Sequence, residues 1–255
     1  MDCVILAGGR PEPDEPLYDY TGGKAKALLK VGELTMLERV AAAVQRAPSV
    51  QEVVIVGLDG TETAGLSFTR PVYFLPDQGG MVANARAGIE WLQAQRPQAT
   101  EVLLSTADAP LLSSAIVEWL VETCRPFNRL AYYTVVRRET MELRFPNSRR
   151  TFVRLKGMQI AGGDLHIVQT RILSTDDELW EALTNARKHA WKLARLVGPG
   201  MLLRLLTRQL TLDAIERTAG RIFGAPIRVV VSPHPELAMD VDRPNQLAIM
   251  RSMAG

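Results

Sequence analysis

Two aspartate motifs have the residue types and spacing of a metal or phosphate site. In LLSTADAPLLS, residues 103–113, Asp108 follows an apolar run that predicts a buried strand. Open α/β sheets bind ligands at the carboxyl ends of their strands, and carboxylate oxygens are preferred ligands of Mg²⁺. In AMDVDRP, residues 238–244, Asp240 and Asp242 would share one face of an extended segment. The alternatives are a turn aspartate and, for Asp242, the N-cap of a following helix.

A glycine pair and a lysine near the amino terminus predict an anion site. The glycines of LAGG, residues 6–9, follow the first apolar run and would let backbone N–H groups turn toward an anion. Lys26 in KALLK could reach phosphates held there, and Lys24 competes for the same role. A tight turn and a solvated loop lysine are the alternatives. The chain contains neither a G-x-G-x-x-G fingerprint nor a P-loop.

Composition limits the function classes. The chain has 255 residues, 47% of them hydrophobic and 23% charged, and its formal net charge of +2 is too small to imply a nucleic-acid partner. Cys3 and Cys124 share no short spacing, so no zinc motif or disulfide framework is expected. No segment approaches the roughly 18 to 20 apolar residues of a membrane span. The amino terminus lacks the pattern of a signal peptide. We therefore expect a protein of the reducing cytoplasm.

The first half of the chain alternates short apolar runs with amphipathic segments, which predicts strand–helix–strand repeats and a mainly parallel sheet. The predicted buried strands are residues 3–7, 52–57, 71–75 and 101–106. Because these runs are continuously apolar, both faces of the sheet should be covered. The first helix follows Thr35, which forms a capping-box pattern with Glu38. Further helices are predicted over residues 82–95 and 114–124.

The second half of the chain lacks the regular strand–helix alternation of the first half. Strands are expected over residues 130–136 and 226–232. Between them, residues 158–168 should form a strand pair or an extended segment, broken at Gly162 and Gly163. Residues 175–224 look helical, with a second capping box at Thr175 and Glu178 and a break at residues 197–200. A last helix should begin near Pro244.

Two segments of the second half are strongly basic. Residues 137–156 hold seven Lys or Arg against two Glu, and could bind an acidic or phosphorylated acceptor or form a solvated hairpin. Residues 187–228 hold nine Lys or Arg against two acidic residues, with leucines interleaved. For this second segment we favour helices packed on the core, followed by a homodimer contact, with a membrane-surface helix pair as the third alternative.

The order of the motifs is more specific than any one of them. LAGG, KALL, TADAPLL and DVDRP resemble, in this order, the nucleotidyltransferase superfamily of GT-A-like fold, and most of all the MobA-like NTP transferase domain. PDQGGMVANARAGIEW, residues 76–91, strengthens the resemblance, and residues 149–168 resemble an uncharacterised branch. The resemblance is strongest over residues 1–125 and 236–250, and weakest over 175–224.

The resemblance implies a fold and a division of the chain. The fold would be α/β and three-layered, built on a mainly parallel mixed sheet with a helical C-terminal insertion. Residues 1–255 would form a single domain. Its parts would be a nucleotide-binding half over 1–125, an acceptor-binding half over 126–174, the helical insertion over 175–224, and a closing strand and helix over 225–255.

The resemblance also implies roles for individual residues. Lys26 would contact the phosphates, and Asp108 would hold Mg²⁺ with Asp242 as its partner. Both Lys26 and Asp108 would be catalytic. The remaining nucleotide contacts would be Leu6, Ala7, Gly8, Gly9, Arg10, Asn84, Gly88 and Thr106. The acceptor contacts would be Arg150, Arg154, Gly163 and Asp164.

The chain departs from the family pattern at three places. The loop after LAGG is long, covering residues 10–23, and its Pro and acidic residues suit an exposed, mobile loop. Arg10 is therefore only a candidate for the arginine that many relatives carry there. Ala25 precedes Lys26 where relatives have proline, and Asp164 stands where they usually have asparagine.

The implied reaction moves a nucleoside monophosphate from an NTP to a small phosphorylated or acidic acceptor, with release of pyrophosphate. A glycosyltransferase that uses a nucleotide-sugar is one alternative. It would normally carry a D-x-D metal motif late in a strand, whereas DVD, residues 240–242, lies near the C-terminus. A nucleotide-binding module without catalysis is another, and Lys26, Asp108 and Asp242 argue against it.

Overall fold

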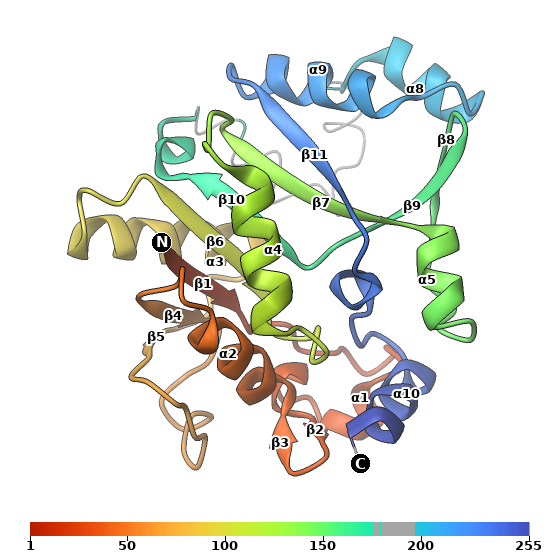
Figure 1. Ribbon diagram of the computed structural model, residues 1–255. Helices are drawn as coiled ribbons and strands as arrows, with labels where there is room; N and C mark the ends of the chain where they lie inside the picture. The colour runs from red at the N-terminus through yellow and green to blue at the C-terminus, as the bar shows by residue number, and fades with distance from the viewer. Residues whose placement is uncertain (176–178, 180–196, 255) are drawn as a thin grey trace.

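A mixed sheet of nine strands forms the centre of the structure (Figure 1). The computed structural model describes residues 1–175, 179 and 197–254. The strands of the sheet are β1 (Asp2–Leu6), β4 (Val53–Val56), β5 (Tyr73–Leu75), β6 (Glu101–Thr106), β7 (Ala131–Arg137), β8 (Val153–Leu155), β9 (Met158–Gly162), β10 (Leu165–Gln169) and β11 (Ile227–Ser232). Their order is β5-β4-β1-β6-β10-β7-β9-β8, and β11 pairs with β7.

Most of these strands run in one direction. Strands β5, β4, β1 and β6 pair in parallel, as do β7 and β11. Strand β10 is antiparallel to both β6 and β7, and β9 is antiparallel to both β7 and β8. Within the described residues only β9 and β10 therefore oppose the rest, which confirms the predicted mainly parallel mixed sheet. A separate hairpin consists of β2 (Lys30–Val31) and β3 (Leu34–Thr35).

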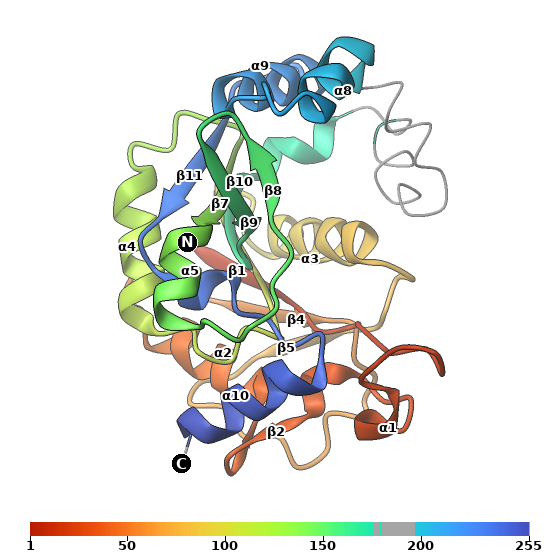
Figure 2. The same ribbon diagram turned by 90° about the vertical axis from the view of Figure 1, so that its right-hand side faces the viewer.

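Helices cover both faces of the sheet, which gives the three predicted layers (Figure 2). Helices α2 (Met36–Arg46) and α4 (Ser114–Cys124) pack on one face, and α3 (Met81–Gln95) packs on the other. The capping box that starts α2 is present: Glu38 N–H donates to the Thr35 hydroxyl, and the Glu38 carboxylate accepts from Thr35 N–H. This local signal fixes where the chain turns from the hairpin into α2.

The remaining short elements lie around these layers. The other helices within the described residues are α1 (Tyr18–Thr21), α5 (Arg138–Arg144), α8 (Pro199–Leu206), α9 (Leu212–Ile222) and α10 (Pro244–Ala254), with 3₁₀ turns η1 (Lys26–Leu28), η2 (Thr170–Ser174) and η3 (Pro235–Ala238). Helices α8 and α9 lie at one end of the molecule, and α1 and α10 at the other (Figures 1 and 2).

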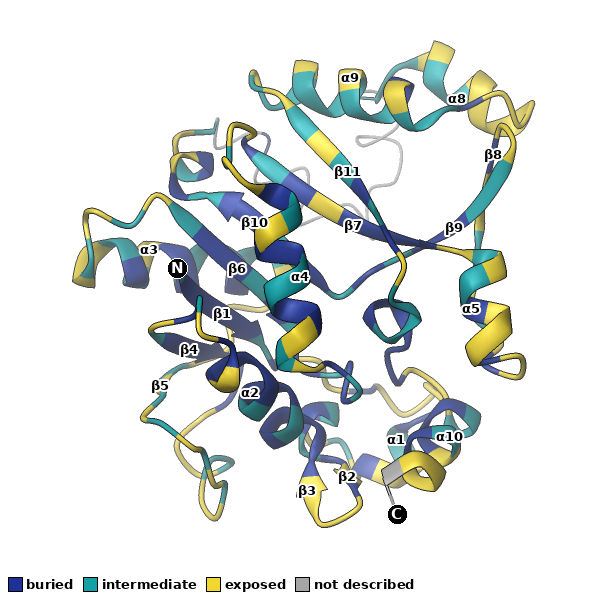
Figure 3. Ribbon diagram, in the orientation of Figure 1, coloured by how far each residue is buried: buried dark blue, intermediate teal, exposed yellow. Residues whose placement is uncertain are grey.

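The core follows from the continuously apolar strands (Figure 3). On β1, Cys3 and Ile5 face the cluster under α2 and α4, whereas Val4 faces the cluster under α3, and all three are fully buried. Side chains that alternate between two apolar clusters require a strand without polar positions. The predicted strand over 71–75 is an exception: β5 covers only Tyr73–Leu75, and it is a partly exposed edge strand.

Four local expectations have definite outcomes. The strand pair broken at Gly162 and Gly163 is confirmed as β9 and β10. The break at 197–200 is confirmed, because Pro199 opens α8 after Gly198. The hairpin alternative for 137–156 is wrong for Arg138–Arg144, which form α5, whereas Val153–Leu155 form β8 and pair antiparallel with β9. The loop over 10–23 is not exposed throughout, because Leu17 is buried beside α1.

Two further expectations fall on the part of the chain that the structure leaves out. The capping partner Glu178 lies outside the described residues, as does the first part of the basic segment 187–228. The second part of that segment is helical, in α8 and α9. No helix among the described residues has the length and apolar sequence that a membrane crossing requires.

Gly88 in α3 provides a test of the packing between this helix and the sheet. A Cβ atom at Gly88 would lie 2.5 Å from Val4 Cγ1 and 3.1 Å from Val56 Cγ2. Since these branched side chains are buried, we expect Gly88→Ala to lower the free energy of unfolding by about 1–3 kcal/mol, despite the better helix propensity of alanine. Urea denaturation measures this change.

The matched background is Val4→Ala, which removes the two methyl groups that the new Cβ would contact. In that background Gly88→Ala should cost less than in the wild type, because contacting sites are energetically coupled. A Gly88→Ala variant as stable as the wild type would contradict the close approach of α3 to β1.

Candidate functional site

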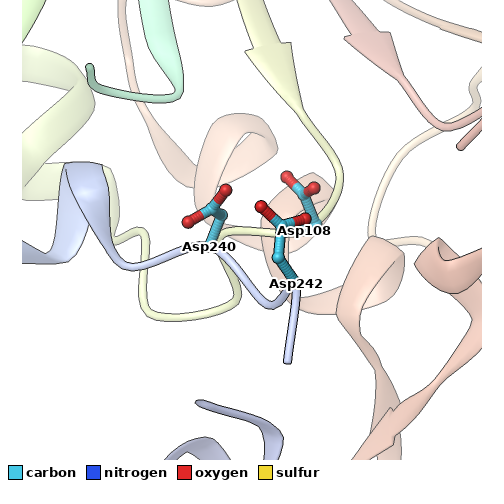
Figure 4. A group of neighbouring side chains, drawn as sticks. All are labelled: Asp108, Asp240 and Asp242. Atoms are coloured by element: carbon cyan, nitrogen blue, oxygen red, sulfur yellow. The ribbon is translucent and has the colours of Figure 1, made fainter. Parts of the chain in front are cut away.

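Three aspartates from two distant segments gather at the carboxyl end of β6 (Figure 4). Asp108 follows β6, whereas Asp240 and Asp242 lie between η3 and α10. One carboxylate oxygen from each lies within 4.8 Å of the others. The two segments are joined through the backbone, because the N–H of Val241 donates to the Asp108 carbonyl at 3.0 Å. The alternation of Asp240 and Asp242 on either side of Val241 thus turns both carboxylates toward Asp108.

Lys26 forms ion pairs with two of these aspartates. Its Nζ atom lies 2.5 Å from Asp108 Oδ2 and 2.6 Å from Asp242 Oδ1. Burial opposes the charge on Lys26, but the charges of Asp108 and Asp242 outweigh this effect, so the pKa of the ammonium group is raised. Lys24, the competing lysine of the sequence, is exposed.

The glycine pair lies directly against Lys26. The N–H of Lys26 donates to the Gly9 carbonyl at 2.8 Å, and a Cβ on Gly9 would lie 3.3 Å from Lys26 Cε. A side chain at Gly9 would therefore crowd the lysine on its way to the carboxylates. Gly9 and Lys26, separated by the long loop in sequence, are therefore neighbours in space.

Gly8 lies against Asn84, a predicted nucleotide contact, and against Asp77, which the sequence did not single out. A Cβ on Gly8 would lie 2.7 Å from Asp77 Oδ1 and 2.8 Å from Asn84 Nδ2. Asn84 donates to Asp77 Oδ1 at 2.7 Å and accepts from the N–H of Gln78 at 2.7 Å. Asn84 therefore orders the loop beside the glycines. Asp77 follows β5 as Asp108 follows β6, so the signal used for Asp108 was also present here.

The break between β9 and β10 places Asp164 in the same region. The Gly163 N–H donates to the Thr134 carbonyl at 2.9 Å, and the Asp164 N–H donates to the Leu237 carbonyl at 2.7 Å. The Asp164 carbonyl in turn accepts from the Thr106 N–H at 3.0 Å. Burial, and then the charge of Asp108, raise the pKa of Asp164 to about 8, although Arg150 and Lys26 act in the opposite direction.

Arg150 and Arg154, both predicted acceptor contacts, occupy different surroundings. Arg150 is largely buried, forms an ion pair with Asp240 and donates to the Gly162 carbonyl at 3.4 Å. Arg154 lies on β8, where it is exposed. The structure therefore brings Arg150 to the carboxylates, whereas Arg154 lies on the last strand of the sheet order.

Four other predicted nucleotide contacts lie at or near the strand ends. Leu6 and Thr106 are paired at the carboxyl ends of β1 and β6. Arg10 donates to the Gly57 carbonyl at 3.2 Å and forms an ion pair with Glu62. Gly88 packs against the sheet, so its lack of a side chain already has a structural reason. The nucleotide role of all four stays a prediction.

A stacked pair of rings, Tyr133 and His166, has no signal in the sequence. Their centroids are 4.4 Å apart, with 13° between the planes. The Thr134 N–H donates to His166 Nδ1 at 3.2 Å. Burial lowers the pKa of His166 to about 4, so the ring is neutral at pH 7. Burial, followed by the charge of Asp164, raises the pKa of the Tyr133 hydroxyl.

The carboxylates fit a divalent cation. Asp108 Oδ2 faces Lys26, but Asp108 Oδ1 is buried and has no hydrogen-bond partner among the described residues. An uncompensated buried carboxylate oxygen is costly. Oxygen ligands from Asp108, Asp240 and Asp242 form the donor set that Mg²⁺ prefers, and Asp108 can keep its ion pair with Lys26 while Oδ1 binds a metal.

Comparison with known proteins points to one family. A family model described as MobA-like NTP transferase domain matches residues 3–211. Molybdenum cofactor guanylyltransferases of Rhodopseudomonas palustris strains HaA2 and BisB5 are 32% and 31% identical over 117 residues, which is 45% of this chain. The alignments cover 50% and 51% of those proteins, so the chain matches about half their length.

Solved structures extend the similarity over nearly the whole chain. A hypothetical transferase from Thermus thermophilus has a TM-score of 0.82 and 31% identity, and the match covers 96% of this chain and 98% of that one. A 2-C-methyl-D-erythritol 4-phosphate cytidylyltransferase, also from Thermus thermophilus, has a TM-score of 0.55 at 18% identity, covering 100% and 99% of the two chains. At that identity the second likeness shows the fold alone.

The neutral ring of His166 predicts a pH dependence of stability. Its pKa is about 4 in the folded state and near 6.5 in an unfolded chain. The unfolded state therefore binds the extra proton between these values, and the stability contribution that is complete above pH 6.5 is lost as the pH falls toward 4. His166→Gln, which keeps an acceptor for the Thr134 N–H, should remove this loss.

The measurement is the free energy of unfolding of both proteins between pH 4 and pH 7. The wild type should lose stability more steeply on acidification than the variant, by up to about 1.4 kcal/mol per pH unit. Parallel curves over this range would show that His166 does not titrate as its burial requires.

Proposed function

The chain belongs to the MobA-like NTP transferase domain family, and from this premise we propose that it transfers a nucleoside monophosphate from an NTP to an acceptor and releases pyrophosphate. The observation that carries the proposal is the position of Lys26 between Asp108 and Asp242, directly against the glycine pair. A cation and several carboxylates around a glycine-bounded surface can hold a triphosphate and the metal that accompanies it.

We assign the nucleotide to the carboxyl ends of β1 and β6. The backbone at Leu6, Ala7, Gly8 and Gly9 would line the nucleotide. A Cβ at Gly8 would meet Asp77 and Asn84, and a Cβ at Gly9 would crowd Lys26, so glycine suits both positions. The names of the curated relatives make GTP the first nucleotide to test.

Lys26 would stabilise charge on the departing pyrophosphate. Its ammonium group keeps its proton at neutral pH because two carboxylates pair with it. Asp108, with Asp242 and Asp240, would hold Mg²⁺, and bound Mg²⁺ supplies charge neutralisation and alignment in phosphoryl transfer. Catalysis by this set would rest on positioning and electrostatics, since no side chain needs to become covalently bound.

The acceptor would lie beside Arg150, Gly163 and Asp164, on the side of the site formed by β9 and β10. Arg150 is a guanidinium suited to a phosphate or carboxylate, and it already forms an ion pair with Asp240. We therefore propose a phosphorylated or acidic small molecule as acceptor. Arg154, exposed on β8, is the weaker member of this set.

The proposal also covers the domain organisation, the partners, the cell compartment and the oligomeric state. We propose that residues 1–255 act as one domain, with an NTP and a small acceptor as partners and no nucleic acid. Cys3 and Cys124 are both free and buried, which suits a reducing cytoplasm. Self-association into a homodimer stays a prediction.

A screen of NTPs with Mg²⁺ by thermal shift tests the proposal first, and pyrophosphate release with pools of acceptors tests it second. Pyrophosphate release also separates the alternatives, because neither a glycosyltransferase nor a non-catalytic nucleotide-binding module produces it. Failure of every NTP to raise the melting temperature would count decisively against this function.

Asp108→Asn tests the metal assignment. The change keeps the shape of the side chain but removes the charge that faces Lys26 and the proposed metal. We expect Mg²⁺-dependent pyrophosphate release to be abolished while the circular dichroism spectrum is unchanged. The matched control is Asp213→Asn, at an exposed carboxylate on α9. Turnover of Asp108→Asn at the wild-type rate would overturn the assignment.

Lys26→Ala tests the phosphate contact. Removal of one preorganised donor to a developing negative charge costs about 3–4 kcal/mol, which corresponds to a loss of roughly 100-fold to 1,000-fold in kcat. Lys24→Ala is the matched control, because Lys24 is exposed in the same loop. Steady-state kinetics of pyrophosphate release compares the two variants. If Lys24→Ala alone were impaired, the assigned lysine would be the wrong one.

A further inference from the structure

A second cavity lies away from the carboxylate site. It has a volume of about 640 Å³ and is lined by the end of α4, the loop before β7, α9 and the start of β11. Strands β6, β7 and β11 all run in the same direction. The cavity lies at the amino ends of β7 and β11, whereas Asp108 lies at the carboxyl end of β6, so the two lie at opposite ends of the sheet.

Arginines dominate the charge of this cavity. Its walls contain Arg125, Arg129, Arg217 and Arg228, and Glu216 is the one acidic residue among the described residues that line it. Glu216 already accepts from the Val229 N–H at 2.7 Å, so its carboxylate is engaged by the backbone. Four exposed arginines and one glutamate thus line the same hollow.

Most of these arginines lack ion pairs. Arg125 pairs with Glu122 at 2.9 Å. Within the part of the chain that the structure describes, Arg129, Arg217 and Arg228 form none. Like charges around one concave surface repel one another and raise the local concentration of anions.

Helix termini explain only part of this charge. Arg125 follows α4 directly as its C-cap, where a cation is stabilised by the helix dipole. Arg217 lies more than one turn before the end of α9, and Arg228 lies on β11. Neither arginine can act as the cation of a helix C-terminus. Interaction with a helix dipole therefore does not explain why Arg217 and Arg228 lie at this cavity.

The walls of the cavity suit a small ligand. The ring of Tyr132 is buried at its inner side, and its hydroxyl oxygen accepts from the Arg129 N–H at 3.2 Å. Gly220 and Ala225 also line it and lie close together, since a Cβ on Gly220 would be 3.3 Å from the Ala225 carbonyl oxygen. A volume of about 640 Å³ lies within the range of small-molecule sites.

We propose that this cavity binds a phosphate-bearing small molecule through Arg129, Arg217 and Arg228, at a site separate from the carboxylate cluster. Guanidinium groups match phosphate oxygens in geometry and charge. The volume of about 640 Å³ also leaves room for more than a single phosphate, and Ile227 adds an apolar residue to the lining. The proposal is independent of the proposed nucleotidyl transfer.

Isothermal titration calorimetry of the full chain tests this site. The probes are inorganic phosphate, pyrophosphate and ADP, in EDTA and about 0.15 M salt, where screening suppresses weak surface attraction. We expect saturable binding of pyrophosphate or ADP with a stoichiometry of one. The double variant Arg217→Gln/Arg228→Gln should bind at least about tenfold more weakly.

The matched control is Arg221→Gln, an exposed arginine on α9 that does not line the cavity. It should bind within about twofold of the wild type. Circular dichroism and melting temperature establish that each variant folds.

Three results would overturn the proposal. One is the absence of saturable binding by all three probes. Another is binding that the double variant retains and Lys26→Ala loses, which would assign the anion to the carboxylate site. The third is a short DNA duplex that binds more tightly than ADP and loses its affinity in the double variant, because the arginines would then form a nucleic-acid surface.

Discussion

The ammonium group of Lys26 is the contact on which the arrangement of the site depends. It joins Asp108 and Asp242, which come from two distant segments of the chain, and its backbone N–H is bonded to the Gly9 carbonyl. Two carboxylates brought this close would repel each other without a cation. The ion pairs therefore hold the segment before α10 against the end of β6, so the C-terminal segment is part of the site.

A second set of backbone contacts, beside the carboxylate cluster, joins the β9–β10 break to β6, β7 and η3. The break between β9 and β10 frees the backbone of Gly163 and Asp164 to bond with Thr134, Leu237 and Thr106. A Cβ on Gly163 would lie 2.2 Å from Thr134 Oγ1, so only glycine fits this position. The result is a carboxyl group at Asp164 whose pKa is raised, first by burial and then by the charge of Asp108.

How far the sequence predicts this structure depends on the range of each interaction. The strands and the start of α2 follow from local patterns, namely continuous apolar runs and the Thr35 capping box. The position of Asp108 in the site was predictable, because it follows a buried strand and open α/β sheets bind ligands at the carboxyl ends of their strands. Helix α5 was not predicted, because its basic residues were interpreted as part of a charged segment. The helical signals are the i,i+4 pair of Arg138 and Glu142 and the buried side chain of Met141.

Contacts between distant segments could not be derived in this way. The choice of Lys26 over Lys24 depends on which lysine the loop turns toward Asp108, and the pairing of Arg150 with Asp240 joins positions with no common local pattern. The same limit applies to the arginine-lined cavity. Arg217 and Arg228 belong to the basic segment 187–228, whereas Arg125 and Arg129 lie outside both basic segments, and only the fold separates Arg221, which does not line the cavity, from Arg217 and Arg228, which do.

The charges at the two ends of the sheet are opposite in sign, and this difference constrains what each end can bind. At the carboxyl end of β6, Asp108 Oδ1 is buried without a partner in the described residues, so a cation lowers the free energy of the site. At the amino ends of β7 and β11, the arginines that line the cavity would instead be stabilised by an anion. An anion without its metal would meet three carboxylates beside Lys26 and Arg150 at the first site, and four arginines beside Glu216 at the second. Metal-free phosphates should therefore prefer the arginine cavity, whereas a metal-bound triphosphate fits the carboxylates.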